Sequence, residues 1–310
     1  DYLYMIGKVA AVLTGAGIGA SVAAKLNASP LVVISSATAG MVGAFASKIL
    51  AGAVLTEGVM VFAGVGEPLG AYLAAMVCIY IGRLVSGRTK IDILITPFCC
   101  IIGGSAVGLL IGPPISSFMN WLGSVINWGT EQAPFLMGII VSVVMGMVLT
   151  LPISSAALGI ILGLNGIAAG AATVGCCANM IGFAVASYKE NKVNGLLAQG
   201  LGTSMLQISN IVKKPLIWLP VILTSAILGP ISTMVFKMTN NATGSGMGTA
   251  GLVGQINAYQ TMVSEGSSPA FVVFEIILMH FVLPALLTWI ISEAMRKANL
   301  IKYGDMKLNV

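Results

Sequence analysis

The feature that most constrains this chain is its shortage of charge over long apolar stretches. Such stretches follow one another almost continuously over residues 1–300, and 57% of all residues are hydrophobic while 8% are charged. A soluble domain carries roughly 25% charged residues. A surface this poor in charge is stable only against lipid, so the sequence predicts an all-α polytopic membrane protein. The function is then expected at a bilayer, as transport, conduction, sensing or intramembrane chemistry.

Apolar stretches of about 20 residues predict the membrane-spanning helices. The candidate 154–168 is short and is broken by Asn165–Gly166, so 154–187 is either two short spans or one span with a re-entrant hairpin. Nine spans place residue 1 outside if the C-terminus lies inside, and a further helix upstream of Asp1 would make ten. The nine candidates are 5–26, 31–52, 60–82, 91–112, 134–152, 154–168, 170–187, 215–236 and 271–292.

The basic residues form four clusters, and short basic loops stay in the cytoplasm, so all four are predicted on the inner side. The net charge of +5 therefore reflects topology, and the chain lacks the solvated basic face with aromatic residues that nucleic-acid binding needs. The stretch 113–133 has no Lys or Arg and is predicted as an outer interfacial segment, with Trp121 and Trp128 at headgroup depth. The clusters are Arg83, Arg88 and Lys90; Lys189 and Lys192; Lys213 and Lys214; and Arg296, Lys297, Lys302 and Lys307.

Two polar inserts interrupt the apolar pattern. Residues 195–212 lie between two clusters predicted inside, so this segment cannot cross the membrane once; it lies along the surface or enters and returns. Residues 239–260 are Gly-rich, polar and uncharged. Irregular backbone at membrane depth persists only where protein or a water-filled cavity solvates it.

Three short matches in the same order predict an internal duplication. The matches are Ile-Ser-Ser-Ala at 34–37 and 153–156, Gly-Pro-Pro-Ile-Ser-Ser at 112–117 against Gly-Pro-Ile-Ser-Thr at 229–233, and Glu131, Pro134 and Phe135 against Glu265, Pro269 and Phe271. We interpret them as two parallel membrane repeats, 1–133 and 134–270, with a closing helix and cytoplasmic tail at 271–310. Repeats in transporters place the solute near the midplane at their interface. Because the second copy differs by the two polar inserts, we expect the site there.

No motif for catalysis, a metal or a cofactor is visible. The chain has no Walker motif, no GxSxG elbow and no HExxH, so an ATP-driven pump or a soluble-type hydrolase is disfavoured. All five cysteines lie in apolar stretches, where small packing residues are expected and neither a disulfide framework nor a metal site is implied. They are Cys78, Cys99, Cys100, Cys176 and Cys177.

Ionisable side chains inside spans cost roughly 2.5–3.5 kcal/mol on insertion scales, so they should face a cavity or a partner. Glu67 precedes Pro68 in a Gly/Pro-broken segment and is a solute-ligand candidate, whereas Glu57 could also lie in an outer loop. His280 either bonds the backbone freed by Pro284 or binds solute or a proton. Glu275 is a coupling candidate, and its five-residue separation from His280 argues against a direct ion pair.

Neutral polar side chains suit a polyhydroxyl or zwitterionic ligand, although each one alone serves equally well as glue between helices. The substrate-binding candidates among them are Asn179, Gln199, Thr203, Gln255 and Asn257, and Asn165, Gln207 and Asn210 are of the same kind.

Long segments of the chain resemble one family. The segments are LPISSAALGIILGLNGIAAGAATVGCCANMIGFAV at 151–185, GLLAQGLGTSMLQISNIVKKP at 195–215, ILGPISTMVFKM at 227–238 and GSGMGTAGLVGQI at 244–256. They are similar to EIIC-like membrane proteins of the bacterial phosphotransferase system, in the perfringolysin-regulator-like branch.

The resemblance implies a permease component of the bacterial cytoplasmic membrane, commonly a homodimer within the lipid, that moves a sugar phosphorylated during uptake. This chain carries no phosphoryl-carrier domain, so EIIA and EIIB would be separate subunits. Related proteins use an intramembrane Glu in a broken segment and a His, and Glu67 and His280 are the matching residue types here. We therefore expect a transporter with alternating access, a midplane site and no cofactor. Two alternatives stay open: a sensor or regulator without transport, and an ion- or proton-coupled carrier in which Glu67, Glu275 and His280 titrate.

Overall fold

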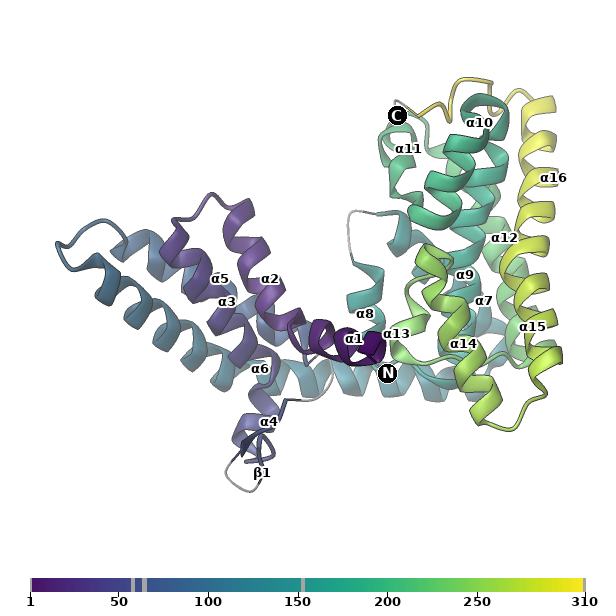
Figure 1. The fold of residues 1–310 in the computed structure, drawn as a ribbon. Helices are drawn as coiled ribbons and strands as arrows, with labels where there is room; N and C mark the ends of the chain where they lie inside the picture. The colour runs from purple at the N-terminus through teal and green to yellow at the C-terminus, as the bar shows by residue number, and fades with distance from the viewer. Residues whose placement is uncertain (1, 57–58, 63–65, 152–153, 309–310) are drawn as a thin grey trace. The chain divides into compact units, whose positions relative to one another are not determined.

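The computed structural model describes residues 2–56, 59–62, 66–151 and 154–308, which form two units (Figure 1). Unit 1 is Asp1–Trp121 and unit 2 is Leu122–Val310. The elements that begin in unit 1 are α1 (Tyr2–Val12), α2 (Thr14–Lys25), α3 (Pro30–Ala44), α4 (Ala46–Leu50), β1 (Leu55–Thr56), β2 (Val59–Met60), α5 (Pro68–Val85) and α6 (Asp92–Gln132).

The elements of unit 2 after α6 are α-helices of 4 to 21 residues, interrupted by short π- and 3-10 helices labelled η. They are α7 (Pro134–Thr150), α8 (Ser155–Ile161), α9 (Gly166–Ala186), α10 (Tyr188–Leu197), η1 (Ala198–Gly202), η2 (Ser204–Gln207), α11 (Ile208–Lys213), η3 (Pro215–Trp218), α12 (Leu219–Pro230), η4 (Ile231–Phe236), α13 (Ala242–Ser245), η5 (Ala250–Leu252), α14 (Val253–Ser264), α15 (Pro269–Ile277), η6 (Leu278–Val282) and α16 (Leu283–Lys297). Prolines open α3, α5, α7 and α15, where the missing N–H costs nothing.

The all-α, multi-pass class is confirmed, but the number of long helices is smaller than expected. Five helices within the described residues are long and apolar enough to cross a membrane: α5, α6, α9, Pro215–Phe236 and Pro269–Lys297. The pair α1–α2, bent by 51°, makes a sixth if it counts as one span, and α3 and α7 are apolar but shorter. The predicted span 154–168 is wrong, because α8 has seven residues and the chain turns before α9.

Two predicted boundaries are also corrected. The span expected at 60–82 begins only at Pro68, because the chain first forms the antiparallel pair of two-residue strands β1 and β2. The helix expected at 91–112 continues to Gln132 through three internal prolines, which helices in a membrane tolerate. The stretch 113–133, predicted as an interfacial segment, is therefore helical, and Trp121 and Trp128 are exposed on it.

Small residues hold unit 1 together. Its helices α2, α3 and α5 pack against one another, and a Cβ on Gly19 of α2 would collide with the backbone of Ser36 on α3. Such close approach of backbones is the usual basis of helix packing in lipid, where no hydrophobic force drives helices together. The core cluster is correspondingly light: Ala23, Val32, Ala39, Ala74, Cys78, Ile79 and Cys100.

Helix α9 is the centre of unit 2. It packs against α7, α12 and α16, which lie around it in Figure 1, and almost all its side chains are buried. A Cβ on Gly175 of α9 would overlap the backbone of Ser142 on α7, so only glycine permits this approach. Because its side chains are small and mostly apolar, α9 is packed closely by the helices around it.

The chain breaks between α8 and α9, where the sequence predicts an interruption. Gly163 and Gly166 have φ of +58° and +55°, which the absence of a side chain allows. Asn127 of α6 satisfies the freed backbone: its Nδ2 donates to the carbonyl of Gly163 at 3.0 Å, and its Oδ1 accepts from the N–H of Asn165 at 3.2 Å. The side chain of Asn127 therefore stabilises the break between α8 and α9.

The second polar insert, 239–260, lies against α8 and α9. The hydroxyl of Ser155 donates to the carbonyl of Gly246 at 2.6 Å, and the N–H of Asn240 donates to the carbonyl of Gly166 at 3.2 Å. Polar groups of the protein thus form hydrogen bonds with this irregular backbone, as its Gly-rich, uncharged composition predicts.

Candidate functional site

A buried pair of polar side chains, His280 and Gln255, is the strongest candidate site. His280 lies in the π-helical turn η6, four residues before Pro284, which has no N–H to offer the His280 carbonyl. The Nε2 of Gln255 on α14 lies 3.2 Å from His280 Nδ1 and 3.3 Å from the sulfur of Cys177 on α9. His280 is 1% exposed and Gln255 7%. Three elements distant in sequence therefore converge on this pair.

The contact fixes the hydrogen-bonding capacity of both side chains. An amide nitrogen only donates, so His280 Nδ1 accepts and the neutral ring carries its proton on Nε2. The Oε1 of Gln255 is buried and has no hydrogen-bond partner in the described part of the chain. An unpartnered buried acceptor costs about 1–3 kcal/mol. The pair thus presents one costly open acceptor, the Oε1 of Gln255.

The polar side chains around the pair form a scaffold. Asn240 Nδ2 donates to Thr173 at 2.8 Å and to the carbonyl of Gly254 at 3.1 Å, next to Gln255. The Oδ1 of Asn257 accepts from Asn241 at 2.9 Å. Sequence reasoning placed Gln255 and Asn257 in the site but missed Asn240 and Thr173; the polar composition of 239–260 was the signal for the first of these.

Glu275 lies on α15, which packs against α14. Its side chain is 1% exposed, and its Oε2 is buried without a hydrogen-bond partner among the residues described. No group of three or more His, Cys, Asp or Glu that could hold a metal occurs in residues 2–56, 59–62, 66–151 and 154–308.

Glu67 is in unit 1, at the N-terminus of α5. Its Oε1 accepts a hydrogen bond of 3.0 Å from the hydroxyl of Ser47, and its N–H donates to the carbonyl of Ala44 at 2.7 Å. Gly66 before it has φ of +69°. The Gly-Glu-Pro sequence thus forms the non-helical start of α5, whereas the sequence predicted a break inside a span at 60–82. The other acidic candidate, Glu57, lies outside the described residues.

Asn179 is a packing node. It is fully buried, its Oδ1 accepts from Thr150 and from the indole N–H of Trp218, both at 3.2 Å, and its Nδ2 donates to Ser225 at 3.3 Å. These partners tie α7, α9, η3 and α12 together. The geometry favours the role of glue between helices that the sequence left open. Thr203 has a similar local role, because its hydroxyl accepts from the N–H of Met205 and caps η2.

Gln199 belongs to an amide network that holds the C-terminal tail, residues 299–308. Its Oε1 accepts from Gln207 at 2.8 Å, and Gln207 also donates to the carbonyl of Met306 at 3.0 Å. Asn210 donates to the carbonyl of Lys307 at 3.0 Å. The first polar insert therefore binds a segment of the chain's own backbone about 100 residues away.

Charged side chains complete this clamp on the tail. Glu190 and Arg296, each 5% exposed, pair at 3.4 Å, and Lys214 pairs with Asp305 at 2.6 Å. Burial raises the pKa of Asp305, but the hydrogen bonds from Lys214 and from a backbone N–H outweigh it and lower the pKa below the usual value. Three of the four basic clusters thus meet at one end of unit 2 (Figure 1), as expected if they share one side of a membrane.

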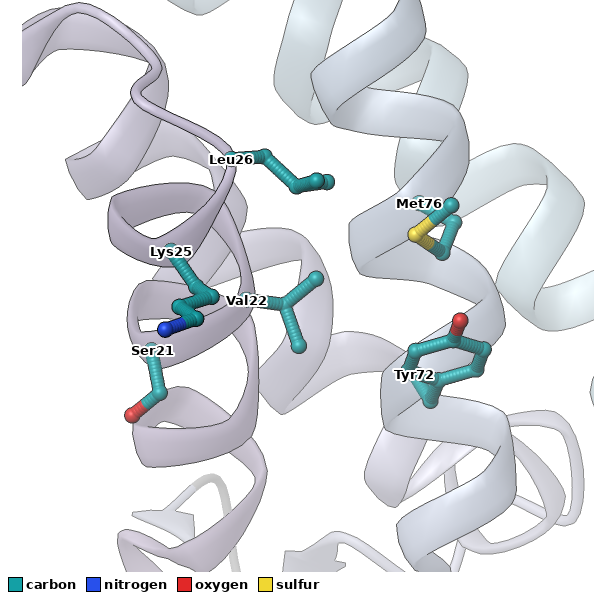
Figure 2. Close-up of a pocket in the computed structure, with 6 residues that line it drawn as sticks. All are labelled: Ser21, Val22, Lys25, Leu26, Tyr72 and Met76. Carbon is teal, nitrogen blue, oxygen red and sulfur yellow. The ribbon is translucent and has the colours of Figure 1, made fainter.

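A groove of about 330 Å³ lies between α2 and α5 of unit 1. Figure 2 shows Val22 and Leu26 facing Tyr72 and Met76 across it, while the polar end of Lys25 points away. An apolar groove without convergent polar groups lacks the orienting contacts of a solute site.

Comparison with known proteins agrees with the membrane architecture. A family model described as "Phosphotransferase system, EIIC" matches residues 1–308. No curated protein and no solved structure matches the chain. The family consists of membrane sugar-transport subunits, which in general act with EIIA and EIIB components. Because the match covers nearly all of the helical architecture described above, the chain belongs to the EIIC family of the phosphotransferase system.

Proposed function

We propose that this chain is the sugar-translocating subunit of a bacterial cytoplasmic-membrane phosphotransferase system and that it holds its sugar at the His280–Gln255 pair. One observation carries the proposal: the pair leaves a buried acceptor, Gln255 Oε1, without a hydrogen-bond partner among the described residues. A sugar hydroxyl can donate to this acceptor.

Translocation would proceed by alternating access. His280 and Gln255 are almost fully buried, so a sugar reaches them only if neighbouring segments move. The π-helical turn η6 and the residues with positive φ at Gly248, Gly251 and Leu252 flank the pair and supply adaptable backbone. Hinges of this kind absorb the dihedral changes that open a closed site.

The proposed phosphoryl transfer uses separate EIIA and EIIB subunits and a homodimer of this chain. The single histidine of the sequence lies in η6 and is buried. We therefore assign it to sugar binding and leave the phosphoryl-carrying residues to the partner subunits. The perfringolysin-regulator-like branch and the parallel repeats 1–133 and 134–270 stay predictions; the compact units divide between Trp121 and Leu122.

Thermal unfolding of the purified protein against a panel of sugars tests the site, because a ligand of the folded state raises Tm by mass action. Gln255→Leu should weaken binding of the stabilising sugar about 5- to 150-fold, the equivalent of about 1–3 kcal/mol. Gln260→Leu is the matched control, since Gln260 is exposed on the same helix. Unchanged affinity in Gln255→Leu removes the pair from the site.

Uptake into vesicles tests the function. Dependence on phosphoenolpyruvate and the general carrier proteins supports the proposal. Sugar binding without uptake would instead support the sensor. Glu67→Gln is expected to reduce sugar affinity if this residue of unit 1 is a ligand, and unchanged affinity would exclude it.

An ion- or proton-coupled carrier is a second candidate, favoured by Glu275. Its buried Oε2 has no partner in the described residues, and an uncompensated carboxylate inside a span is costly. Under this alternative, Glu275→Gln would abolish the dependence of uptake on pH or sodium and leave sugar affinity unchanged. If uptake by the wild type depends on neither pH nor sodium, the ion- or proton-coupled carrier is excluded.

A further inference from the structure

A small groove of about 170 Å³ lies in unit 2 where α9 ends, α10 begins and α16 passes. Its lining includes Tyr188, Lys189, Trp289 and Glu293. We propose that this groove binds the headgroup of a zwitterionic phospholipid that carries a primary amine, with the acyl chains along α16. This inference does not depend on which solute the chain transports.

The position of the groove fits the boundary between lipid and water. It opens beside the last turns of the span Pro269–Lys297, about two turns before Arg296. Trp289 is 49% exposed, and Leu286 and Ile290 are exposed nearby on α16. Tryptophans concentrate at headgroup depth, with apolar side chains toward the hydrocarbon. Acyl chains therefore have an apolar helix surface directly below the groove.

The charge of the groove fits a headgroup with both signs. Lys189 Nζ lies 3.1 Å from both carboxylate oxygens of Glu293 and 2.8 Å from the hydroxyl of Tyr303. The two charged residues that line the groove, Lys189 and Glu293, are paired with each other, so the lining itself carries no net charge, and the other cations of the basic clusters lie outside it. A groove whose lining has no net charge offers no unpaired cation to an anionic headgroup.

The individual groups match the two ends of the headgroup. A carboxylate has about four acceptor positions, so Glu293 can accept from an ammonium group while it stays paired with Lys189. Aromatic rings, here Tyr188 and Trp289, favour a cation beside them. Lys189, 54% exposed at the rim, donates its N–H groups to Glu293 and Tyr303, so it would act on the phosphate through its positive charge. The primary amine matters, because a quaternary ammonium has no N–H to donate to Glu293.

The size of the groove also restricts its occupant. Pockets for drug-sized ligands measure about 300–1,000 Å³. A groove of about 170 Å³ is too small for a whole lipid or a sugar phosphate with its shell of contacts, and it suits one headgroup.

Native mass spectrometry of the full-length protein, loaded with equal amounts of phosphatidylethanolamine, phosphatidylcholine and phosphatidylglycerol, tests the proposal. The wild type should retain phosphatidylethanolamine about tenfold better than the other two, the magnitude of one charge-assisted hydrogen bond. Equal retention of all three lipids, or a preference for phosphatidylglycerol, overturns the proposal. The wild-type protein alone is enough for this measurement.

Two pairs of variants locate the lipid. Glu293→Gln should abolish the preference for the primary amine, whereas Glu131→Gln, an exposed glutamate of α6, should keep it. Trp289→Leu should weaken retention, whereas Trp128→Leu, an exposed tryptophan of α6, should not. A preference that survives Glu293→Gln places the lipid elsewhere and overturns the assignment.

Discussion

The interiors of unit 1 and unit 2 are built from different kinds of contact. Unit 1 packs α2, α3 and α5 through glycine and alanine, and its buried polar side chains within the described residues are Ser35, Ser36 and Thr96. Unit 2 uses the same small residues around α9 but adds buried amides, hydroxyls, a histidine and an ion pair. Close backbone packing thus suffices to hold helices together in lipid. The additional buried polar groups of unit 2 are not needed for that packing, and the proposed solute site is among them.

The buried polar groups of unit 2 divide into two sets. The amides of the first insert and the charged residues nearby satisfy one another and the C-terminal tail. Buried atoms of unit 2 without a hydrogen-bond partner among the described residues are Gln255 Oε1, Glu275 Oε2 and Ser232 Oγ, together with the Nε of Arg296 in the charged set. Satisfied networks stabilise a fold, whereas unpartnered buried groups cost free energy. The two open acceptors, on Gln255 and Glu275, are the groups to which the proposed functions assign a ligand.

The largest expected effect is on the buried ion pair. Glu190→Ala leaves the buried Arg296 guanidinium with only the longer approach to Glu293, at 3.9 Å, and removes the acceptor of the Gly304 N–H, 2.7 Å away. We expect a loss of about 3–5 kcal/mol in the free energy of unfolding, measured by denaturant titration in micelles. The control Glu131→Ala, at an exposed glutamate, should change it little. A loss below about 1 kcal/mol would mean that the pair behaves as a surface pair.

The next effect compares one buried polar residue from each unit. Asn179→Leu leaves the indole N–H of Trp218 without its acceptor. It also removes one hydrogen bond each from Thr150 and Ser225, which keep their bonds to Ser204 and to the carbonyl of Val221. The free energy of unfolding should fall by about 2–4 kcal/mol, since an orphaned buried group costs about 1–3 kcal/mol and a lost hydrogen bond about 1 kcal/mol. Ser36→Ala in unit 1 removes a bond of 3.0 Å to the carbonyl of Gly19 and should cost about 1 kcal/mol. Equal losses in the same titration would break the contrast between the units.

A smaller effect concerns pH and the tail. The folded state lowers the pKa of Asp305, so its stabilising contribution is fully present above the unfolded pKa of 3.8 and is lost as pH falls through the lower folded value. The difference in stability between wild type and Asp305→Asn should be about 0.5–1 kcal/mol near neutral pH, because the pair with Lys214 is partly exposed. Thermal unfolding from pH 7 downward should show this difference shrinking only below about pH 4. A difference that is constant down to pH 2 contradicts the assignment.

The smallest effect is expected at the start of α5. Ser47→Ala removes the hydroxyl that donates to Glu67 at 3.0 Å, and both residues are half-buried. The expected cost is about 0.5–1 kcal/mol. Circular dichroism melting measures it, with Ser21→Ala on α2 as the control. A cost as large as that of Asn179→Leu would show that unit 1 also depends on a polar node.

Much of the fold was predictable from local sequence. The deficit of charge specified helices in a membrane, the span predicted at 134–152 starts where α7 starts, and Asn165–Gly166 marked the break before α9. The predicted span at 154–168 failed because hydrophobicity alone does not distinguish a crossing helix from a short helix that packs on α13. An apolar stretch can be buried in lipid or in protein, and its composition is the same in both cases.

The sequence by itself determined the class of protein and the basic clusters that meet at one end of unit 2. Only the tertiary structure decided what each polar residue does. Gln199 and Gln255 are the same residue type in similar surroundings, yet one joins the network that holds Met306 and the other contacts His280. A hydrogen bond depends on which partner lies within about 3 Å, and packing of segments distant in sequence sets that partner.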